Sequence, residues 1–280
     1  MTVKRAFWQA VEVIHDVVYF APDTKQRYEA IGLKGYWMGY TASRSAALGT
    51  PSPEVVVALF HGFAPQLIGR ALPDAWSMAD RNDILATRLD LARDALAPGL
   101  ADADADVERL AKELTAIWRS LDYAGKGLAA AHTSLPIPDD PIGRLWHATS
   151  ILREYRGDCH VAILTAAGLD GAAANALAVA DGRVPATQRE MRGWTEDEWA
   201  EAYERLRRRA WTDEFATITE SGRAARAQIE DATDRVSASS FDEEAQARTI
   251  TLEDALVAAA RAIEASGALQ FPNPVGVRAP

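Results

Sequence analysis

Apolar residues recur at helical spacing along most of the chain. Phe7, Val11, Ile14 and Val18 are separated by steps of three and four residues, and the same spacing recurs over residues 110–121. Strict alternation of apolar and polar residues, which would predict strands, is scarce. The pattern therefore predicts a mostly α protein.

Polar, proline-rich or glycine-rich stretches interrupt the helical pattern. They are APGLADADAD at residues 97–106, SLPIPDDPIG at 134–143 and SASSFD at 237–242. The second contains three prolines, so we place the main boundary there. This predicts an N-terminal helical unit at 1–135, a second unit at 140–236, and a linker, a helix and an extended tail at 237–280.

Two similar segments suggest an internal repeat. RAFWQAVEVIH near the start resembles RLWHATSILRE after the boundary, and Gly35 and Gly49 have the same separation as Gly157 and Gly171. An apolar helical segment follows each glycine pair. We predict two related helical units packed on one another, with chance similarity of alanine-rich helices as the alternative.

The second unit has the element order of a winged helix-turn-helix. GLDGAAANALAVA predicts one helix, and TEDEWAEAYERLRRR predicts a second helix that Thr195 and Glu198 begin as a capping box. Residues 211–212 and 216–218 are the best strand candidates and would form a minimal wing. A further helix is expected to begin at Thr219.

The order of elements over 143–236 resembles the winged helix-turn-helix of MarR-type regulators. Thr219, Gly222 and Arg223 match the start of the helix that follows the wing in that family. The chain, particularly WHATSILREYRGDCHVAILTAAGLDG and RGWTEDEW, also resembles an actinobacterial family of helical proteins that carry such a domain. The resemblance implies this architecture and no particular chemistry.

Charge makes DNA an unfavourable partner for this domain. The net charge is −10 and the isoelectric point is near 5.1, and an acidic surface repels nucleic acid unless a basic patch compensates. The helix expected to enter the major groove carries Glu196, Asp197, Glu198 and Glu201 in its first half. Its arginines lie at the other end, and the wing TDEFAT has no basic residue.

Composition predicts a cytoplasmic protein without a membrane span. The chain has one cysteine, which excludes an intramolecular disulfide framework and fits a reducing compartment. No segment approaches the roughly 18 consecutive apolar residues of a membrane helix. An oligomer is compatible with the sequence.

The stretch RLWHATSILREYRGDCHVAILTAAGLDG, which begins at Arg144, gathers the chemically active residues. We expect a helix from about Ile142 that ends at Gly157, with Asp158 capping the next helix. Asp158 and His160 would then lie at a helix N-terminus, which favours an anion. Arg153 and Arg156 immediately precede them.

Four interpretations of this stretch remain open. It is a structural network of ion pairs, an anion-binding corner, an acid–base site or a metal site. In the acid–base case His160, oriented by Asp158, transfers the proton, with His147 as its partner. In the metal case His15 joins these three side chains, but H-E-x-x-H or similar spacing is absent and we predict no metal.

We predict a small organic or anionic ligand held between the two halves. The expected ligand-binding residues are His15, Tyr19, Arg44, Trp146, Arg153 and Arg156. A ligand-responsive MarR-like transcription regulator is the alternative. A cofactor-independent lyase, isomerase or cyclase that uses His160, Asp158 and His147 is a further one, because no phosphate-binding loop, nucleophile elbow or dinucleotide fingerprint is present.

Overall fold

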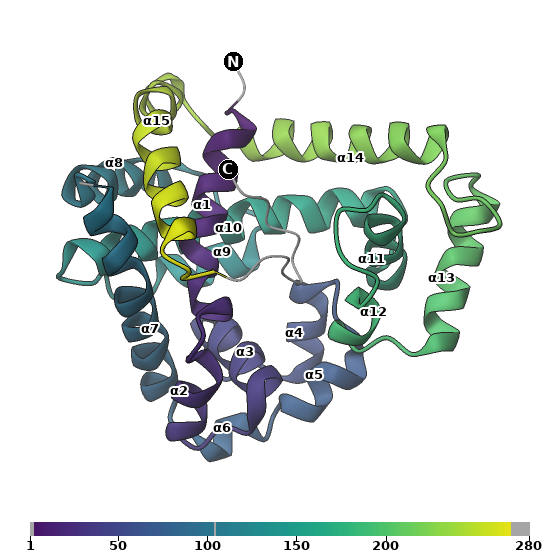
Figure 1. The fold of residues 1–280 in the computed structure, drawn as a ribbon, viewed down its shortest axis with the longest axis horizontal. Coiled ribbons are helices and arrows are strands. Elements are labelled where there is room, and N and C mark those ends of the chain that lie inside the picture. The colour runs from purple at the N-terminus through teal and green to yellow at the C-terminus, as the bar shows by residue number, and fades with distance from the viewer. Residues whose placement is uncertain (1–2, 104, 270–280) are drawn as a thin grey trace.

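The computed structural model describes residues 3–103 and 105–269, and these residues are mostly α-helical, as the sequence predicts (Figure 1). Helices of the first half precede the long central helix α10 (Pro141–Ala166). In chain order they are α1 (Arg5–Phe20), α2 (Thr24–Ala30), α3 (Gly35–Ser45), the 3-10 helix η1 (Ala46–Leu48), α4 (Pro53–Phe60), α5 (Pro65–Ala71), α6 (Ala75–Met78), α7 (Arg81–Asp102), α8 (Val107–Ser120) and α9 (Gly127–Thr133). After α10 come α11 (Gly171–Ala180), α12 (Gln188–Met191), α13 (Glu196–Arg208), α14 (Glu220–Ala238) and α15 (Glu243–Ala265).

Helix α10 is the centre of the molecule and packs against α1, α7, α8, α9 and α14. It begins where the sequence predicts, because Pro141 occupies its first turn and the Asp140 carboxylate accepts a hydrogen bond from Gly143 N at 2.8 Å. It ends at Ala166, and Gly168 beyond it has a positive φ of 66°, which allows Leu169 N to donate to Leu164 O at 3.0 Å.

The expected break at Gly157 is wrong, because α10 continues through that residue. The glycine spacing that suggested an internal repeat loses its value as support for the same reason. Gly35 stands at the start of α3 with a φ of 71°, whereas Gly157 is inside a helix. Gly49 follows η1, but Gly171 begins α11. The matching glycine separations therefore do not mark equivalent positions.

The main hydrophobic core combines the first half of the chain with the beginning of α10 and with α15. The predicted stripe Phe7, Val11, Ile14 and Val18 on α1 is fully buried in it. Helix α15 packs on α1 and α7 (Figure 1), so this helix belongs to the main core. Of the predicted C-terminal tail, residues 270–280 lie outside the described part of the chain.

A second, smaller core lies where the sequence predicts the helix-turn-helix, and the segment α11–α13 keeps that name below. Helices α11 and α13 pack on each other, and Leu164 of α10 and Ile229 of α14 complete the cluster. The predicted capping box is confirmed, since Glu198 N donates to Thr195 Oγ1 at 3.2 Å and Thr195 N donates to the Glu198 carboxylate at 2.9 Å. Helix α10 contributes residues to both cores.

The predicted wing is absent as a pair of strands. Thr212 and Ile218 form one isolated antiparallel bridge, and residues 3–103 and 105–269 contain no strand. The turn is held by the Asp213 carboxylate, which accepts hydrogen bonds from Phe215 N and Thr217 N. Backbone bonds from Asp213 N to Thr217 O at 2.9 Å and from Thr219 N to Trp211 O at 3.0 Å also cross the turn, but they do not extend into a ladder.

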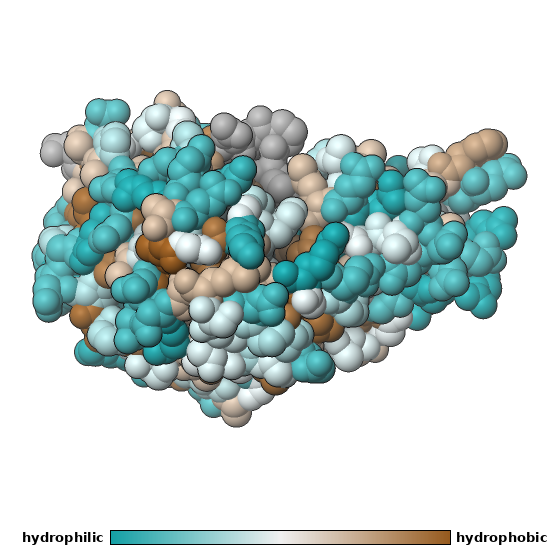
Figure 2. All heavy atoms as spheres, turned by 90° about the horizontal axis from the view of Figure 1, so that it is seen from below, coloured by the Kyte–Doolittle hydropathy of each residue, from teal (hydrophilic) through white to brown (hydrophobic). Residues whose placement is uncertain are grey.

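Hydrophilic residues predominate on the face shown in Figure 2. Within the described ranges no single helix is long and apolar enough to cross a membrane, although α10 and α11, bent by 97°, pass that test together by length and composition.

Candidate functional site

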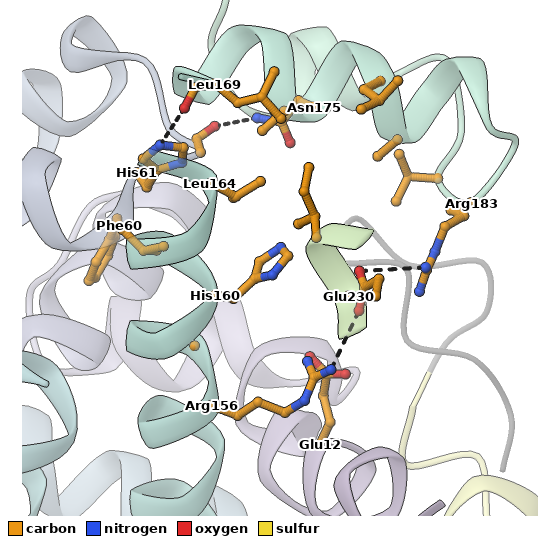
Figure 3. Close-up of a pocket in the computed structure, with 18 of the residues that line it drawn as sticks. Glu12, Phe60, His61, Arg156, His160, Leu164, Leu169, Asn175, Arg183 and Glu230 are labelled. Carbon is orange, nitrogen blue, oxygen red and sulfur yellow. Dashed lines mark hydrogen bonds and ion pairs between the residues drawn. The ribbon is translucent and has the colours of Figure 1, made fainter. Parts of the chain in front are cut away.

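A cavity of about 350 Å³ lies between the two cores. Its walls come from α1, α3 and α4 on one side and from α10, α11, α14 and the segment between α11 and α13 on the other. Figure 3 shows side chains of α10 and α11 pointing into this space. The cavity lies between the two predicted units, and a ligand in it stays a prediction.

Arginine is the dominant polar residue of the cavity wall. Seven arginines of the described part of the chain line it: Arg5, Arg44, Arg153, Arg156, Arg183, Arg192 and Arg226. The carboxylates among the described lining residues are Glu12 and Glu230. The wall is therefore cationic, although the chain as a whole has a net charge of −10.

At one end of the cavity, Arg44 and Arg153 share the buried carboxylate of Glu154. Arg44 Nε and Nη2 donate to Glu154 at 2.9 and 2.8 Å, and Arg153 Nη1 donates to it at 3.1 Å. The two arginines hold the pKa of Glu154 well below its usual range despite its burial. Tyr40 lies at this end too, because its hydroxyl accepts from Arg44 Nη1 at 3.3 Å.

Arg192 reaches the same end from the residue after α12. Its guanidinium lies 4.2 Å from the centre of the Phe63 ring. Burial lowers its pKa, and the neighbouring charges of Arg44 and Arg153 lower it further. Three guanidiniums from three different parts of the chain therefore act on one another here.

A second group of arginines surrounds Glu230 on α14. Arg156, Arg183 and Arg226 lie 3.4, 3.7 and 3.4 Å from its carboxylate oxygens. Figure 3 shows Glu230 between Arg156 and Arg183. Arg156 also contacts Asp234 at 2.9 Å, and Arg226 contacts Asp181 at 2.9 Å. Each arginine of this group thus has at least one carboxylate partner.

His160 points into the cavity between these groups (Figure 3). Its Nδ1 lies 3.0 Å from Thr233 Oγ1, and that hydroxyl donates its proton to Ile229 O at 2.8 Å. Thr233 is then an acceptor, so the tautomer is fixed with the proton on Nδ1 and a lone pair on Nε2. Burial lowers the pKa of His160 to about 4, which makes it neutral at pH 7.

The catalytic triplet expected from the sequence is not brought together. Asp158 Oδ2 accepts from Ala129 N of α9 at 2.9 Å, so this carboxylate fixes α9 on α10 and does not contact His160. It also caps no helix, because α10 runs through it. His147 lies thirteen positions before His160 on α10, about 20 Å along the axis. The anion-binding helix N-terminus predicted at Asp158 and His160 therefore does not exist.

Four of the predicted site residues lie in the main core, away from the cavity wall. They are His15, Tyr19, Trp146 and His147, and all are buried. His15 Nδ1 pairs with Ser150 Oγ at 2.8 Å, and Trp146 Nε1 donates to His15 O at 3.2 Å. These contacts describe a polar network inside the core, as one of the four interpretations proposed.

Arg88 on α7 lies at the centre of that network, and no sequence pattern predicted its role. It is 1% exposed and donates to Tyr19 Oη at 2.7 Å and to His132 Nε2 at 3.0 Å. Its guanidinium lies 5.1 Å from the Trp146 ring, at cation–π distance. His132 on α9 is buried too, and burial lowers its pKa to about 4.

Of the nine predicted site residues, Arg44, Arg153, Arg156 and His160 line the cavity. The missed lining residues include Arg183, Arg192, Arg226 and Glu230. They lie in the turn of the helix-turn-helix and on α14, and no local spacing joins them to α10. Among the described residues no group of three or more His, Cys, Asp or Glu side chains could hold a metal ion.

The helix-turn-helix is fastened to the main core by the loop between α4 and α5. His61 Nε2 donates to Leu169 O at 3.2 Å, and Gly62 O accepts from Asn175 Nδ2 at 2.7 Å and from Trp194 Nε1 at 3.2 Å. Ala64 N donates to Arg192 O at 2.9 Å. His61 and Gly62 of this loop also line the cavity.

The outer face of α13 is acidic, as the sequence predicts. The side chains of Glu196 and Glu201 are 87% and 76% exposed. In its second half, Arg205 pairs with Asp170 at 2.8 Å and Arg207 pairs with Glu204 at 2.6 Å, so at least these two arginines have carboxylate partners.

The profile of a Helix-turn-helix family matches residues 4–270 of the chain. The chain belongs to this family. The match covers both cores, so the family is defined by the whole arrangement and not by the helix-turn-helix alone. No curated protein and no solved structure matches the chain significantly.

Proposed function

We propose that this member of the helix-turn-helix family binds a small organic anion in the cavity between its two cores. The observation that carries the proposal is the arginine-rich wall of a cavity in an otherwise acidic protein. Guanidiniums held close together repel one another, and an anion that accepts hydrogen bonds from several of them relieves that repulsion. The volume of about 350 Å³ falls within the range of small-molecule sites.

Calorimetric titration of benzoate against its neutral analogue benzamide tests the proposal. Benzoate should bind measurably, and benzamide should bind at least about tenfold more weakly, since only the carboxylate gains charge-assisted hydrogen bonds. Arg192→Gln should weaken benzoate binding. Arg70→Gln removes an exposed charge on α5 and serves as the matched control. Equal binding of the two molecules, or none of either together with no binding of phosphate, would overturn the proposal.

A ligand-responsive, MarR-like regulator of transcription is a second candidate. Membership of a helix-turn-helix family and the packed pair α11 and α13 favour it. The acidic face of α13 opposes it, since carboxylates would approach phosphates. A gel-shift titration at low salt against the DNA flanking the gene tests this candidate, which requires a band whose affinity falls steeply with salt.

The geometry gives less support to acid–base catalysis. A base with a pKa of about 4 removes protons poorly near neutral pH, because burial lowers the pKa of His160 more than the nearby Glu230 carboxylate raises it. His160 is better suited to accept a hydrogen bond through Nε2 from a ligand.

A further inference from the structure

We infer that the ligand is an amphipathic anion, with its charged group at the Tyr40 end of the cavity and its apolar part along α10 beneath α11, an assignment that rests on the proposed function. The wall itself changes from charged to apolar in this direction. The change can be followed along one face of α10.

Four residues of α10 share the face that lines the cavity. Arg153, Arg156, His160 and Leu164 follow one another at steps of three, four and four residues. With a rise of 1.5 Å per residue, Arg153 and Leu164 are about 16 Å apart along the helix axis. A molecule lying along this stripe meets cations at one end and a leucine at the other.

The balance of charge places the anionic group near Arg44 and Arg153. These two guanidiniums share one carboxylate, Glu154, as their close partner. Asp16 lies 3.9 Å from Arg153, but burial raises the pKa of Asp16 to about 7, so its negative charge is incomplete at neutral pH. Glu12 also lies 3.9 Å from Arg153, so an anion at this end meets two guanidiniums that share one close carboxylate and have the other two at a greater distance.

The arginines around Glu230 offer less to an anion. Glu230, Asp181 and Asp234 supply three carboxylates within 3.7 Å of Arg156, Arg183 or Arg226. An anion there would compete with these existing ion pairs. These arginines therefore line the cavity without binding the anionic group of the ligand.

The apolar end is built from the second core. Leu164, Leu169 and Leu177 belong to that core and also line the cavity, together with Val161 and Ile229. An apolar ligand part placed there would remove more of this surface from water and add to the packing between the cores. Between the two ends, His160 Nε2 is open to a hydrogen-bond donor on the ligand.

A series of alkyl phosphates tests the assignment in calorimetric titrations of the full chain. The probes are inorganic phosphate and its ethyl, butyl and hexyl esters, with 1-hexanol as the neutral control. Affinity should rise by up to about fourfold for each added methylene. Hexanol should bind far more weakly than hexyl phosphate.

Two variants separate the ends of the site. Arg192→Gln should lower the affinity for every phosphate by a similar factor and leave the gain per methylene unchanged. Val161→Thr, which keeps the side-chain shape in a half-buried lining position, should lower the affinity for hexyl phosphate by about three- to tenfold and leave inorganic phosphate unchanged. Val55→Thr alters an exposed valine outside the cavity and is the matched control.

The outcomes distinguish the assignment from the proposed function. Binding of phosphate without any gain from the alkyl chain, or equal binding of hexanol and hexyl phosphate, overturns the amphipathic assignment alone. Absence of binding by all phosphates and by benzoate overturns both. If the melting temperature shows that Val161→Thr is unfolded, Val184→Thr, another half-buried lining position, decides the same question.

Discussion

Arg44 and Glu154 form a two-pronged, buried ion pair that joins α3 to α10, with nitrogen–oxygen distances of 2.9 and 2.8 Å. Arg153 donates to the same carboxylate from the neighbouring position on α10. Glu154 is therefore the close carboxylate partner of both arginines at the end of the cavity where the anion is proposed to bind, and Glu12 and Asp16 lie farther away, at 3.9 Å from Arg153. Removal of Glu154 would leave both charges buried.

Glu154→Gln is expected to lower the free energy of unfolding by about 3–5 kcal/mol, because it leaves buried guanidiniums without their carboxylate. Urea denaturation followed by circular dichroism measures the change. Glu108→Gln is the matched control, since Glu108 is 63% exposed and pairs with Arg144 at the surface. That control should cost less than about 1 kcal/mol. Similar costs for the two variants would show that burial does not govern the Glu154 pair.

Asp16→Asn should stabilise the protein increasingly as the pH rises from about 4 to 7. Burial raises the pKa of Asp16 from 3.8 to about 7, so in this range the unfolded state has lost a proton that the folded state retains. In the unmodified protein, the contribution of Asp16 to the free energy of unfolding therefore falls as the pH rises, by at most about 1.4 kcal/mol per pH unit. The variant lacks this contribution. Urea midpoints measured at several pH values would contradict the assignment if the difference stayed constant.

His160→Gln should remove a pH dependence of the opposite sign. The pKa of His160 falls from 6.5 in the unfolded chain to about 4 in the folded one, so the unfolded state binds the extra proton between these values. Stability from this group is present above pH 6.5 and is lost as the pH falls toward 4. The variant should show a shallower rise in unfolding free energy, by up to about 1.4 kcal/mol per pH unit in that window. An unchanged slope would mean that His160 titrates normally.

Gly171→Ala should destabilise the contact between α11 and the loop after α4. A Cβ at position 171 would lie 2.0 Å from His61 O, which is backbone and cannot move aside cheaply. We expect a loss of about 1–3 kcal/mol. Gly69→Ala on α5 is the control, because nothing lies within 4 Å of its added Cβ. The control should be neutral or stabilising by up to about 1 kcal/mol, since alanine favours helix.

Local signals in the sequence predicted the capping box of α13 and the buried stripe of α1. Each depends on residues within a few positions of one another. The helix through Gly157 could not be predicted this way. One glycine costs a helix only about 1 kcal/mol, and contacts of α10 with α9 and α14 more than offset it.

The cavity could be predicted only in part, because its residues come from distant segments. Arg153, Arg156 and His160 are close together in the sequence and were found. Arg192 and Glu230 are brought to them by the turn of the helix-turn-helix and by α14, which runs beside α10 (Figure 1). Conversely, His15, Trp146 and His147 are polar or aromatic residues that the core uses, and no sequence pattern separates that role from ligand binding.

The continuity of α10 also limits how the chain can be divided. A cut in the proline-rich segment before Pro141 would expose Leu145, Ile151 and Leu152 in the C-terminal fragment, because their packing partners lie in the first half of the chain. The N-terminal fragment would lose its central helix. The helix-turn-helix therefore cannot be transferred to another protein on its own. Exchanging it between proteins would require exchanging α10 too, so substitutions in the two cores must remain mutually compatible along this one helix.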